Sequence, residues 1–293
     1  MAATPASALM SGPEHEFLLP DLRFVAVERL VPHERHDDRR MTPLVQRIRE
    51  QAMLKNPPIA APLPGPRAEQ RFVVLDGANR VAAARAAGLL HLVVQVVRYE
   101  PPHVELRTWY HALAEGSRGQ FEMAAGRIPG LRCRDEEALH ARALLARREV
   151  LATVSFRDGG VLTFAGGRDL AERNNLLNAL VDVYRDRRFY RLSTDSLDAA
   201  TARYPEVTAL VVFPHFEPAE ILELATRGEH MPAGITRHLI RWRALRINIA
   251  LDQLADDGHA LEEKNRWLNE WLREKLAMRE VRFYEESTVL FDE

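Results

Sequence analysis

The chain has 293 residues, of which 46% are hydrophobic and 28% are charged, so it is long enough for one large domain or two modest ones with real cores. Its 40 basic and 42 acidic residues leave a formal charge of −2, without the one-sided basic excess of proteins that bind DNA non-specifically. Cys133 is the single cysteine, which excludes an intramolecular disulfide and a paired-cysteine metal site and favours a cytoplasmic protein.

The first elements predicted along the chain precede residue 62. Residues 1–20 are rich in Ala, Pro and Ser and are expected to form a disordered tail without a secretory signal. Phe24–Leu30 alternates in hydrophobicity as a half-buried strand does. Pro43–Gln51 follows a Thr-Pro helix start and is predicted to be helical, and Pro58–Ala61 is predicted to be short and extended.

A compact strand–helix–strand segment comes next. Phe72–Leu75 is an apolar strand, Asn79–Ala87 an Ala-rich helix closed by Gly88, and Leu92–Val97 a second buried strand. This order predicts a βαβ-type unit.

The second half also mixes strands and helices, which predicts an α+β domain that begins near residues 100–105. No run of 18 apolar residues occurs, so no membrane span is expected. The predicted elements are strands at Val161–Phe164 and Val207–Phe213, helices at Leu170–Tyr184, 218–228 and Leu261–Arg279, and a final strand at Val281–Leu290.

The turn at residues 76–80, with the sequence DGANR, carries the clearest chemistry. A buried strand delivers Asp76 to a turn that Gly77 permits, and unpaired backbone amides from Ala78 onward then open a helix, which is a site that binds anions. Asn79 is able to cap the helix, Arg80 to reach a phosphate oxygen, and Asp76 to hold a divalent ion. Taken alone, the same pattern also fits an ordinary strand–turn–helix junction.

The wider pattern from Phe72 to Val97 resembles the signature segment of the ParB/sulfiredoxin superfamily, and within it the free L-serine kinases. Three further steps match that family in order, namely Pro32-His33-Glu34, Thr108-Trp109-Tyr110 and Thr236-Arg237-His238. The resemblance covers roughly residues 22–254.

The resemblance implies an α/β fold with a ParB/sulfiredoxin-like nucleotide-binding domain over residues 21–102. A second, α+β domain at 103–255 would serve the substrate side, and residues 256–293 would form a helical extension of open role. It also implies a kinase that phosphorylates free L-serine to O-phospho-L-serine with Mg²⁺ and either ATP or ADP.

The resemblance gives each matching residue a role. Glu34 would be the general base, with the alternative that it is a solvated residue of a charged run. His33, Gly77, Ala78, Asn79 and Arg80 would contact nucleotide or phosphate, and Asp76 would act in catalysis and hold Mg²⁺. Trp109, Thr236, Arg237 and His238 would hold the substrate; the alternatives are core packing for Trp109 and a polar helix end for the other three.

Two departures from the family concern the donor and the acceptor. Asn79 stands where the archaeal ADP-dependent kinases have His, which favours ATP without deciding it. The stretch Gln51–Pro58 lacks the Gly/Ser-rich loop of the archaeal enzymes, which leaves its serine contacts in doubt.

The same residues bear on several other functions. A sulfiredoxin-like reductase needs a cysteine in the signature turn, where Ala78 and Asn79 stand instead. A ParB-like DNA-binding regulator, the one hypothesis that expects nucleic acid as a partner, predicts a helix-turn-helix domain after the nucleotide domain. A ligand sensor with a degenerate kinase fold also stays open, and a homodimer through the C-terminal helix is a further expectation.

Overall fold

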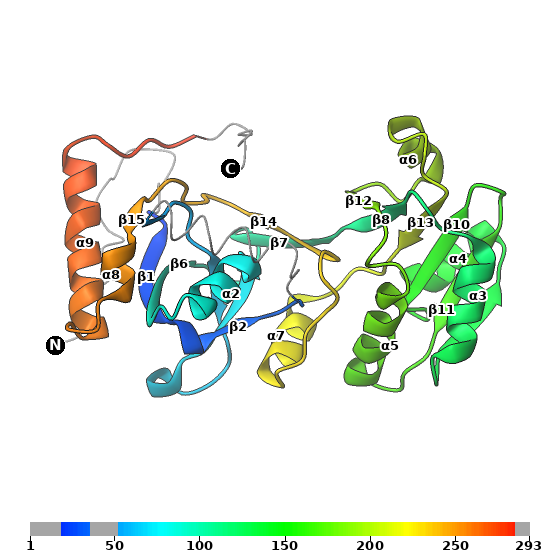
Figure 1. Cartoon of the computed structure of the whole chain (residues 1–293), viewed down its shortest axis with the longest axis horizontal. Coiled ribbons are helices and arrows are strands. Elements are labelled where there is room, and N and C mark those ends of the chain that lie inside the picture. The colour runs from blue at the N-terminus through cyan, green and yellow to red at the C-terminus, as the bar shows by residue number, and fades with distance from the viewer. Residues whose placement is uncertain (1–18, 36–51, 285–293) are drawn as a thin grey trace.

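The computed structural model describes residues 19–35 and 52–284. Its two main β-sheets lie toward opposite ends of the long axis of the molecule, and a two-stranded ribbon runs between them (Figure 1). The C-terminal helices lie beside the first sheet, so segments far apart in the sequence build that end of the molecule.

The first sheet has five strands in the order β1, β6, β4, β5 and β2. β1 (Asp21–Ala26) pairs antiparallel with β6 (His91–Val96), and β4 (Ile59–Pro62) lies parallel to β6 and antiparallel to β5 (Phe72–Asp76). β2 (Leu30–Pro32) runs parallel to β5. Because parallel neighbours point the same way, the residues that follow β2 and β5 emerge at the same edge of the sheet.

Helix α2 (Ala78–Ala86) follows β5 directly and buries Val81 and Ala84. It ends where Gly88 adopts a φ of +73° and the amide of Leu89 donates to the carbonyl of Ala84 at 3.0 Å. A helix that ends in a residue of left-handed conformation favours glycine at that position.

The C-terminal helices α8 (Leu251–Ala255) and α9 (Leu261–Ala277) return to the first sheet. The side-chain amide of Asn265 accepts from the backbone N–H of Phe24 at 2.8 Å and donates to its carbonyl at 3.0 Å. Trp267 also packs on Phe24, with ring centroids 6.2 Å apart. Helix α9 thus covers the exposed edge at β1 and protects it from pairing with another chain.

The second sheet is antiparallel and has six strands. Their order is β12 (Phe189–Leu192), β8 (Tyr110–Leu113), β13 (Ala209–Val212), β10 (Ala152–Phe156), β11 (Val161–Ala165) and β9 (Arg132–Asp135). The helices of this unit are α3 (Arg118–Arg127), α4 (Ala138–Ala146), α5 (Leu170–Asp182), α6 (Leu197–Arg203) and α7 (Pro218–Thr226). This sheet occupies the place where the DNA-binding hypothesis predicts a helix-turn-helix domain.

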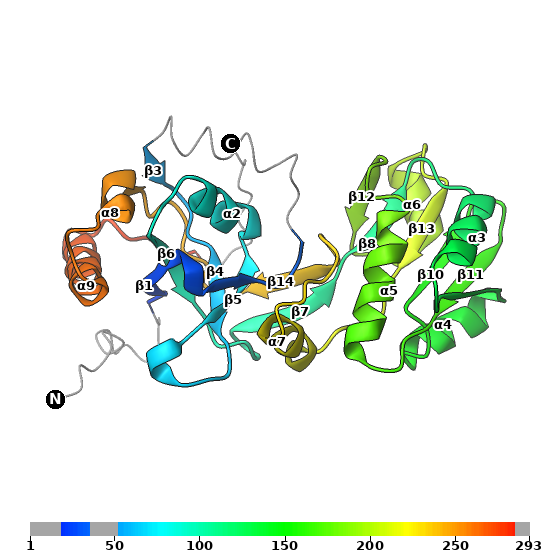
Figure 2. The same ribbon diagram turned by 60° about the horizontal axis from the view of Figure 1, so that its bottom comes forward.

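The connecting ribbon consists of β7 (Val104–Thr108) and β14 (Thr236–Ile240), which pair antiparallel. Figure 2 shows it passing beside the end of β2. One hydrophobic cluster contains Val73 of β5 together with Leu151 and Phe213 of the second unit, so the two units share part of their core. A second, short ribbon is formed by β3 (Met53–Leu54) and β15 (Ile249–Ala250).

Several sequence predictions are corrected here. Phe24–Leu30 is not one strand, because the 3-10 turn η1 (Val27–Arg29) separates β1 from β2 while the apolar pattern continues through it. The βαβ-type unit has the right order but not parallel strands, because β4 inserts between β5 and β6 and reverses their relative direction. Residues 281–284 contain no strand.

The predicted helix Pro43–Gln51 and most of the predicted tail lie outside the described residues. Among residues 19–35 and 52–284, no helix combines the length and the apolar character that crossing a membrane requires.

Candidate active site

The turn between β5 and α2 has the geometry of an anion site. Gly77 is the N-cap of α2 and adopts a φ of +91°, and a Cβ built there would lie 3.1 Å from the Cα of Pro58 and 3.1 Å from Nε of Arg80. The N-cap residue is a glycine and supplies no capping side chain, and a helix start of this kind is a site where backbone amides bind anions. Asn79 lies inside the helix, and the expectation that it caps the helix is therefore wrong.

Asp76 is held by two arginines at the end of β5. Its Oδ2 lies 3.2 Å from Nη2 of Arg80 and 2.7 Å from Nη1 of Arg243. Burial of the carboxyl group opposes its ionisation, but the two guanidinium groups outweigh that effect and lower the pKa of Asp76 below its ordinary value. Asp76 is therefore a carboxylate at neutral pH.

Arg80 also braces the neighbouring loop, because its Nη1 donates to the carbonyl oxygen of Asn56 at 2.8 Å. The same loop contacts the segment that carries Arg243, since Oδ1 of Asn56 accepts from the backbone N–H of Arg246 at 2.9 Å. In this structure Arg80 joins the turn to residues 56–57, and its predicted contact with phosphate stays a prediction.

Glu34 is brought to the same edge of the sheet because β2 runs parallel to β5. Its Oε2 accepts from the backbone N–H of Gly234 at 2.9 Å and lies 4.0 Å from Nε2 of His33. The backbone around it is fixed as well, because the N–H of Met231 donates to the carbonyl of His33 at 2.8 Å and the N–H of Arg35 donates to the carbonyl of Met231 at 2.9 Å. The Glu34 side chain keeps 24% exposure, which leaves it accessible to a ligand.

His33 is buried and links the first sheet to the ribbon. Its Nδ1 donates to the carbonyl of Val74 at 2.5 Å, and its Nε2 lies 2.6 Å from the hydroxyl oxygen of Thr236. Because a carbonyl only accepts, Nδ1 is the atom that donates, and Nε2 is the ring nitrogen that faces the Thr236 hydroxyl. A phosphate group would have to compete with these bonds, and the expectation that His33 contacts phosphate stays a prediction.

His238 lies two residues after Thr236 on β14 and contacts His33 from the same face of the strand. Its ring meets that of His33 edge to face at 5.0 Å, and its Nε2 lies 2.7 Å from the hydroxyl of Tyr99. Burial, assisted by the nearby His33 and Arg243, lowers the pKa of His238 well below its usual value despite a hydrogen bond to the backbone of Leu75. His238 is therefore neutral at physiological pH.

Arg237 and Trp109 form a separate pair. The guanidinium carbon of Arg237 lies 4.3 Å from the centroid of the Trp109 ring. Side chains alternate along a strand, so Arg237 points to the opposite face of β14 from Thr236 and His238. The structure therefore divides the predicted substrate set between two faces, and the alternative of a helix end is wrong because these residues form a strand.

Contacts connect Glu34 to Asp76 around the ends of β2 and β5. They run from Glu34 to Gly234, from His33 to Thr236 and His238, and from His238 to the backbone next to Asp76. Sequence reasoning missed three members of this site. Arg243, Tyr99 and Gly234 are reached through pairings between remote segments, for which no local pattern gives a signal.

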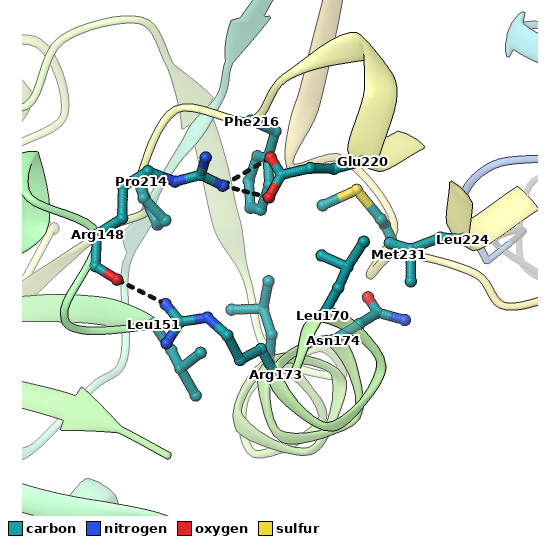
Figure 3. A pocket seen from close by; sticks show the side chains of 11 residues that line it. Arg148, Leu151, Leu170, Arg173, Asn174, Pro214, Phe216, Glu220, Leu224 and Met231 are labelled. Atoms are coloured by element: carbon teal, nitrogen blue, oxygen red, sulfur yellow. Dashed lines mark hydrogen bonds and ion pairs between the residues drawn. The ribbon is translucent and has the colours of Figure 1, made fainter. Parts of the chain in front are cut away.

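The hollow shown in Figure 3 lies away from the turn at Gly77, in the second unit. It holds about 30 Å³, which is room for one or two water molecules. Its arginines are engaged, because Nη2 of Arg148 donates to both carboxylate oxygens of Glu220 at 2.5 and 2.6 Å and Arg173 donates to the carbonyl of Arg148 at 2.9 Å. Within the part of the chain that the structure describes, no group of three or more His, Cys, Asp or Glu side chains is arranged to hold a metal ion.

The chain is similar to several known proteins in sequence and in structure. No family model matches the chain. It is 32% identical over 89 residues to an ATP-dependent L-serine kinase of Staphylothermus marinus, which covers 30% of this chain and 34% of the relative. It is 22% identical over 240 residues to the ADP-dependent L-serine kinase SerK of Thermococcus kodakarensis, which covers 80% of this chain and 93% of the relative.

Among solved structures, a free serine kinase with a glutamate-to-glutamine substitution, in complex with AMP, superimposes with a TM-score of 0.68 at 19% identity. The superposition covers 80% of this chain and 94% of that one. The chain resembles the free serine kinases in sequence and in fold. The expected family resemblance and the mixed α/β fold are thereby confirmed.

The serine kinases with the higher sequence identities are matched over only part of their length. The chain spans 34% of the length of the Staphylothermus marinus kinase and 41% of that of a relative from Desulfurococcus mucosus.

Proposed function

We propose that this protein transfers a phosphoryl group from a nucleotide to the hydroxyl of free L-serine. The observation that carries the proposal is the meeting of Glu34 and the Asp76–Arg80 turn at one edge of the first sheet. The turn offers helix amides for phosphate, and Glu34 offers a partly exposed carboxylate for the acceptor hydroxyl. Relatives named as ATP-dependent and ADP-dependent L-serine kinases support the substrate class.

Glu34 is proposed as the general base. It is fixed by the amide of Gly234, so its carboxylate is oriented before the substrate binds. The serine hydroxyl would give its proton to Glu34 as its oxygen attacks the terminal phosphorus of the nucleotide. The bond from that phosphorus to the bridging oxygen then breaks, and the shortened nucleotide leaves.

The turn is proposed as the phosphate side of the site. Gly77, Ala78 and Asn79 present the start of α2, while Arg80 keeps the turn against the loop at residues 56–57. Asp76 is an ionised oxygen ligand of the kind that Mg²⁺ prefers, and a Mg²⁺ ion held by Asp76 together with phosphate oxygens and water would neutralise charge on the transferred group.

The acceptor side is proposed to come from the ribbon. Arg237, stacked on Trp109, is suited to the serine carboxylate, whereas Thr236 and neutral His238 lie on the face toward His33. Since these groups lie on two faces of β14, we propose that serine binds at the end of the ribbon near Thr236, where both faces are within reach of one small molecule.

The remaining expectations follow from this proposal. ATP and ADP are both retained as donors, because the relatives carry both names. The division into residues 21–102, 103–255 and 256–293, the cytoplasmic location and a homodimer through α9 are kept as proposals. In a homodimer, only the part of α9 that does not already pack on β1 of its own chain would contact the second copy.

The test is a product assay with L-serine, Mg²⁺ and either ATP or ADP, in which O-phosphoserine is measured by mass spectrometry. Glu34→Gln keeps a side-chain oxygen that can accept from Gly234 but cannot take a proton, and we expect it to lower kcat by about 10²–10⁴-fold with nucleotide affinity unchanged. Glu122→Gln, an exposed glutamate on α3, is the matched control. Absence of phosphoserine with both nucleotides, or equal rates for Glu34→Gln and wild type, would contradict the proposal.

A further inference from the structure

A hydrogen-bonded pair of polar side chains lies in the core of the second unit. His111 of β8 is completely buried, Tyr184 is 2% exposed, and Nδ1 of His111 lies 2.8 Å from the Tyr184 hydroxyl. The ring of His111 packs against Phe189 at 4.5 Å and against Phe213 at 5.1 Å. Burying two polar groups among aromatic rings costs free energy that an apolar pair would avoid. Packing alone therefore does not account for His111 and Tyr184 at these positions.

The other ring nitrogen of His111 points to the backbone beside the proposed active site. Its Nε2 lies 3.0 Å from the carbonyl oxygen of Gly234. Burial is the main cause that lowers the pKa of His111 to about 3, so the ring is neutral and carries one proton. Because a carbonyl only accepts, that proton is on Nε2, and Nδ1 accepts from Tyr184.

Gly234 is the residue whose N–H donates to Glu34. Its carbonyl is therefore fixed by His111 on one side and its amide by the Glu34 carboxylate on the other, at 3.0 and 2.9 Å. Gly234 adopts a φ of +77°, and the Arg191 guanidinium occupies the position where a Cβ would lie. The backbone angles of Gly234 thus couple the direction of its carbonyl to that of its N–H, which belong to neighbouring peptide groups.

The segment His230–Gly234, which we call the strap, is anchored to the second unit at its other end too. The side-chain amides of Asn174 and Asn178 on α5 donate to the carbonyl of His230 at 3.1 and 2.9 Å. The strap then pairs with the backbone at residues 33–35. The strap bonds to residues 33–35 of the first unit, so it holds Glu34 relative to the second unit.

We infer that His111 is a positioning residue for Glu34, acting through the backbone of Gly234. The inference rests on the proposed role of Glu34 as the general base. The Gly234 carbonyl keeps the proton of His111 on Nε2, and Tyr184 holds the ring in place by donating to Nδ1. His111 in turn fixes the peptide group that follows Gly234, and through the backbone angles of Gly234 this constrains the preceding peptide group, whose N–H positions the Glu34 carboxylate.

A displaced Gly234 would turn its N–H away from Oε2 of Glu34. The carboxylate would then lose the hydrogen bond that orients it before the substrate binds, which lowers the rate of the chemical step rather than the affinity for the nucleotide. The other groups that face this site are His33 at 4.0 Å from Glu34 and the Arg191 guanidinium at Gly234.

The experiment compares His111→Leu, which lacks the donor to Gly234, with His111→Gln, whose side-chain NH₂ reaches about as far as Nε2. In the phosphoserine assay, we expect His111→Leu to lower kcat at least tenfold and to leave KM for the nucleotide within twofold. His111→Gln should restore most of the rate.

A second readout does not depend on activity. In ¹⁵N-labelled protein, the Gly234 amide proton should exchange with solvent at least tenfold faster in His111→Leu than in wild type, relative to the amides of β10 and β13, because its hydrogen bond to Glu34 is no longer held in place. An unchanged relative exchange rate of Gly234 in folded His111→Leu overturns the inference whether or not phosphoserine forms, whereas absence of phosphoserine from the wild type counts against the proposed function alone. If His111→Leu does not fold, Tyr184→Phe replaces it, and an unchanged exchange rate of Gly234 there overturns the inference equally.

Discussion

Substitution of Gly77 by alanine tests whether the turn between β5 and α2 is built for a ligand. At a φ of +91°, a residue with a Cβ is strained by about 1–2 kcal/mol. The new methyl group would also lie 3.1 Å from the Cα of Pro58 and 3.1 Å from Nε and Nη2 of Arg80. Arg80 can swing away, but the backbone at Pro58 cannot, so the turn itself must shift.

Gly88 at the other end of α2 provides a matched control. Its φ is +73°, and nothing lies within 4 Å of a Cβ built there. Gly88→Ala therefore incurs the backbone strain without crowding any neighbour. We expect both variants to lose about 1–2 kcal/mol of stability through strain, with a larger loss for Gly77→Ala.

The decisive measurement is nucleotide affinity by isothermal titration calorimetry with ATP and with ADP. A turn displaced by a few tenths of an ångström misaligns the first amides of α2, and we expect Gly77→Ala to weaken binding at least tenfold, or about 1.4 kcal/mol. Gly88→Ala should bind within twofold of wild type. Equal affinities for the two variants would refute the assignment of phosphate to this turn.

Three further predictions concern charged and titratable groups. Arg243→Gln should lower the free energy of unfolding at pH 7 by about 0.2–1 kcal/mol. The lowered pKa of Asp76 stabilises the fold fully above its ordinary value of 3.8, so the difference between variant and wild type should fade as the pH drops through the folded pKa. Urea unfolding that gives the same difference at pH 7 and pH 3 would contradict this prediction. Lys264→Met should cost about 1–3 kcal/mol in a thermal unfolding assay, because the buried amine donates to the carbonyls of Gln253 and Asp256. Lys275→Met, near the end of α9, should cost less than about 1 kcal/mol, because that side chain is 40% exposed and pairs with Glu280 at the surface. Similar losses for the two variants would argue against the buried role of Lys264. The wild type should lose stability as the pH falls from 6.5 to 3, by up to about 1.4 kcal/mol per pH unit, because unfolding lets His111 take up a proton at its ordinary pKa of 6.5 rather than about 3. In His111→Gln, the urea midpoint should depend less steeply on pH. Identical pH dependences of the two midpoints would speak against a neutral buried ring.

The sequence alone determined the segment from β5 to β6 well. The apolar run of Phe72–Leu75, the glycine at 77 and the glycine at 88 are local signals, and they correctly located a strand, a turn and a helix. Local signals suffice there because a turn with positive φ and a left-handed helix end depend on the residues at those positions more than on distant partners. The four short motifs of the resemblance were identified in the same way, from residues adjacent in the chain.

Only the tertiary structure decided how these motifs combine. The parallel pairing of β2 with β5 brings Glu34 to the turn at Asp76, and no pattern in either strand states which neighbour it will have. Asp76 meets Arg243, and Glu34 meets Gly234, across more than 160 residues of chain. The Thr-Arg-His motif also divides between two faces because residues 236–240 form a strand, in which alternate side chains point apart. Strand order and long-range pairing depend on how the whole chain buries its apolar surface, and that information is spread over the sequence rather than written at the site.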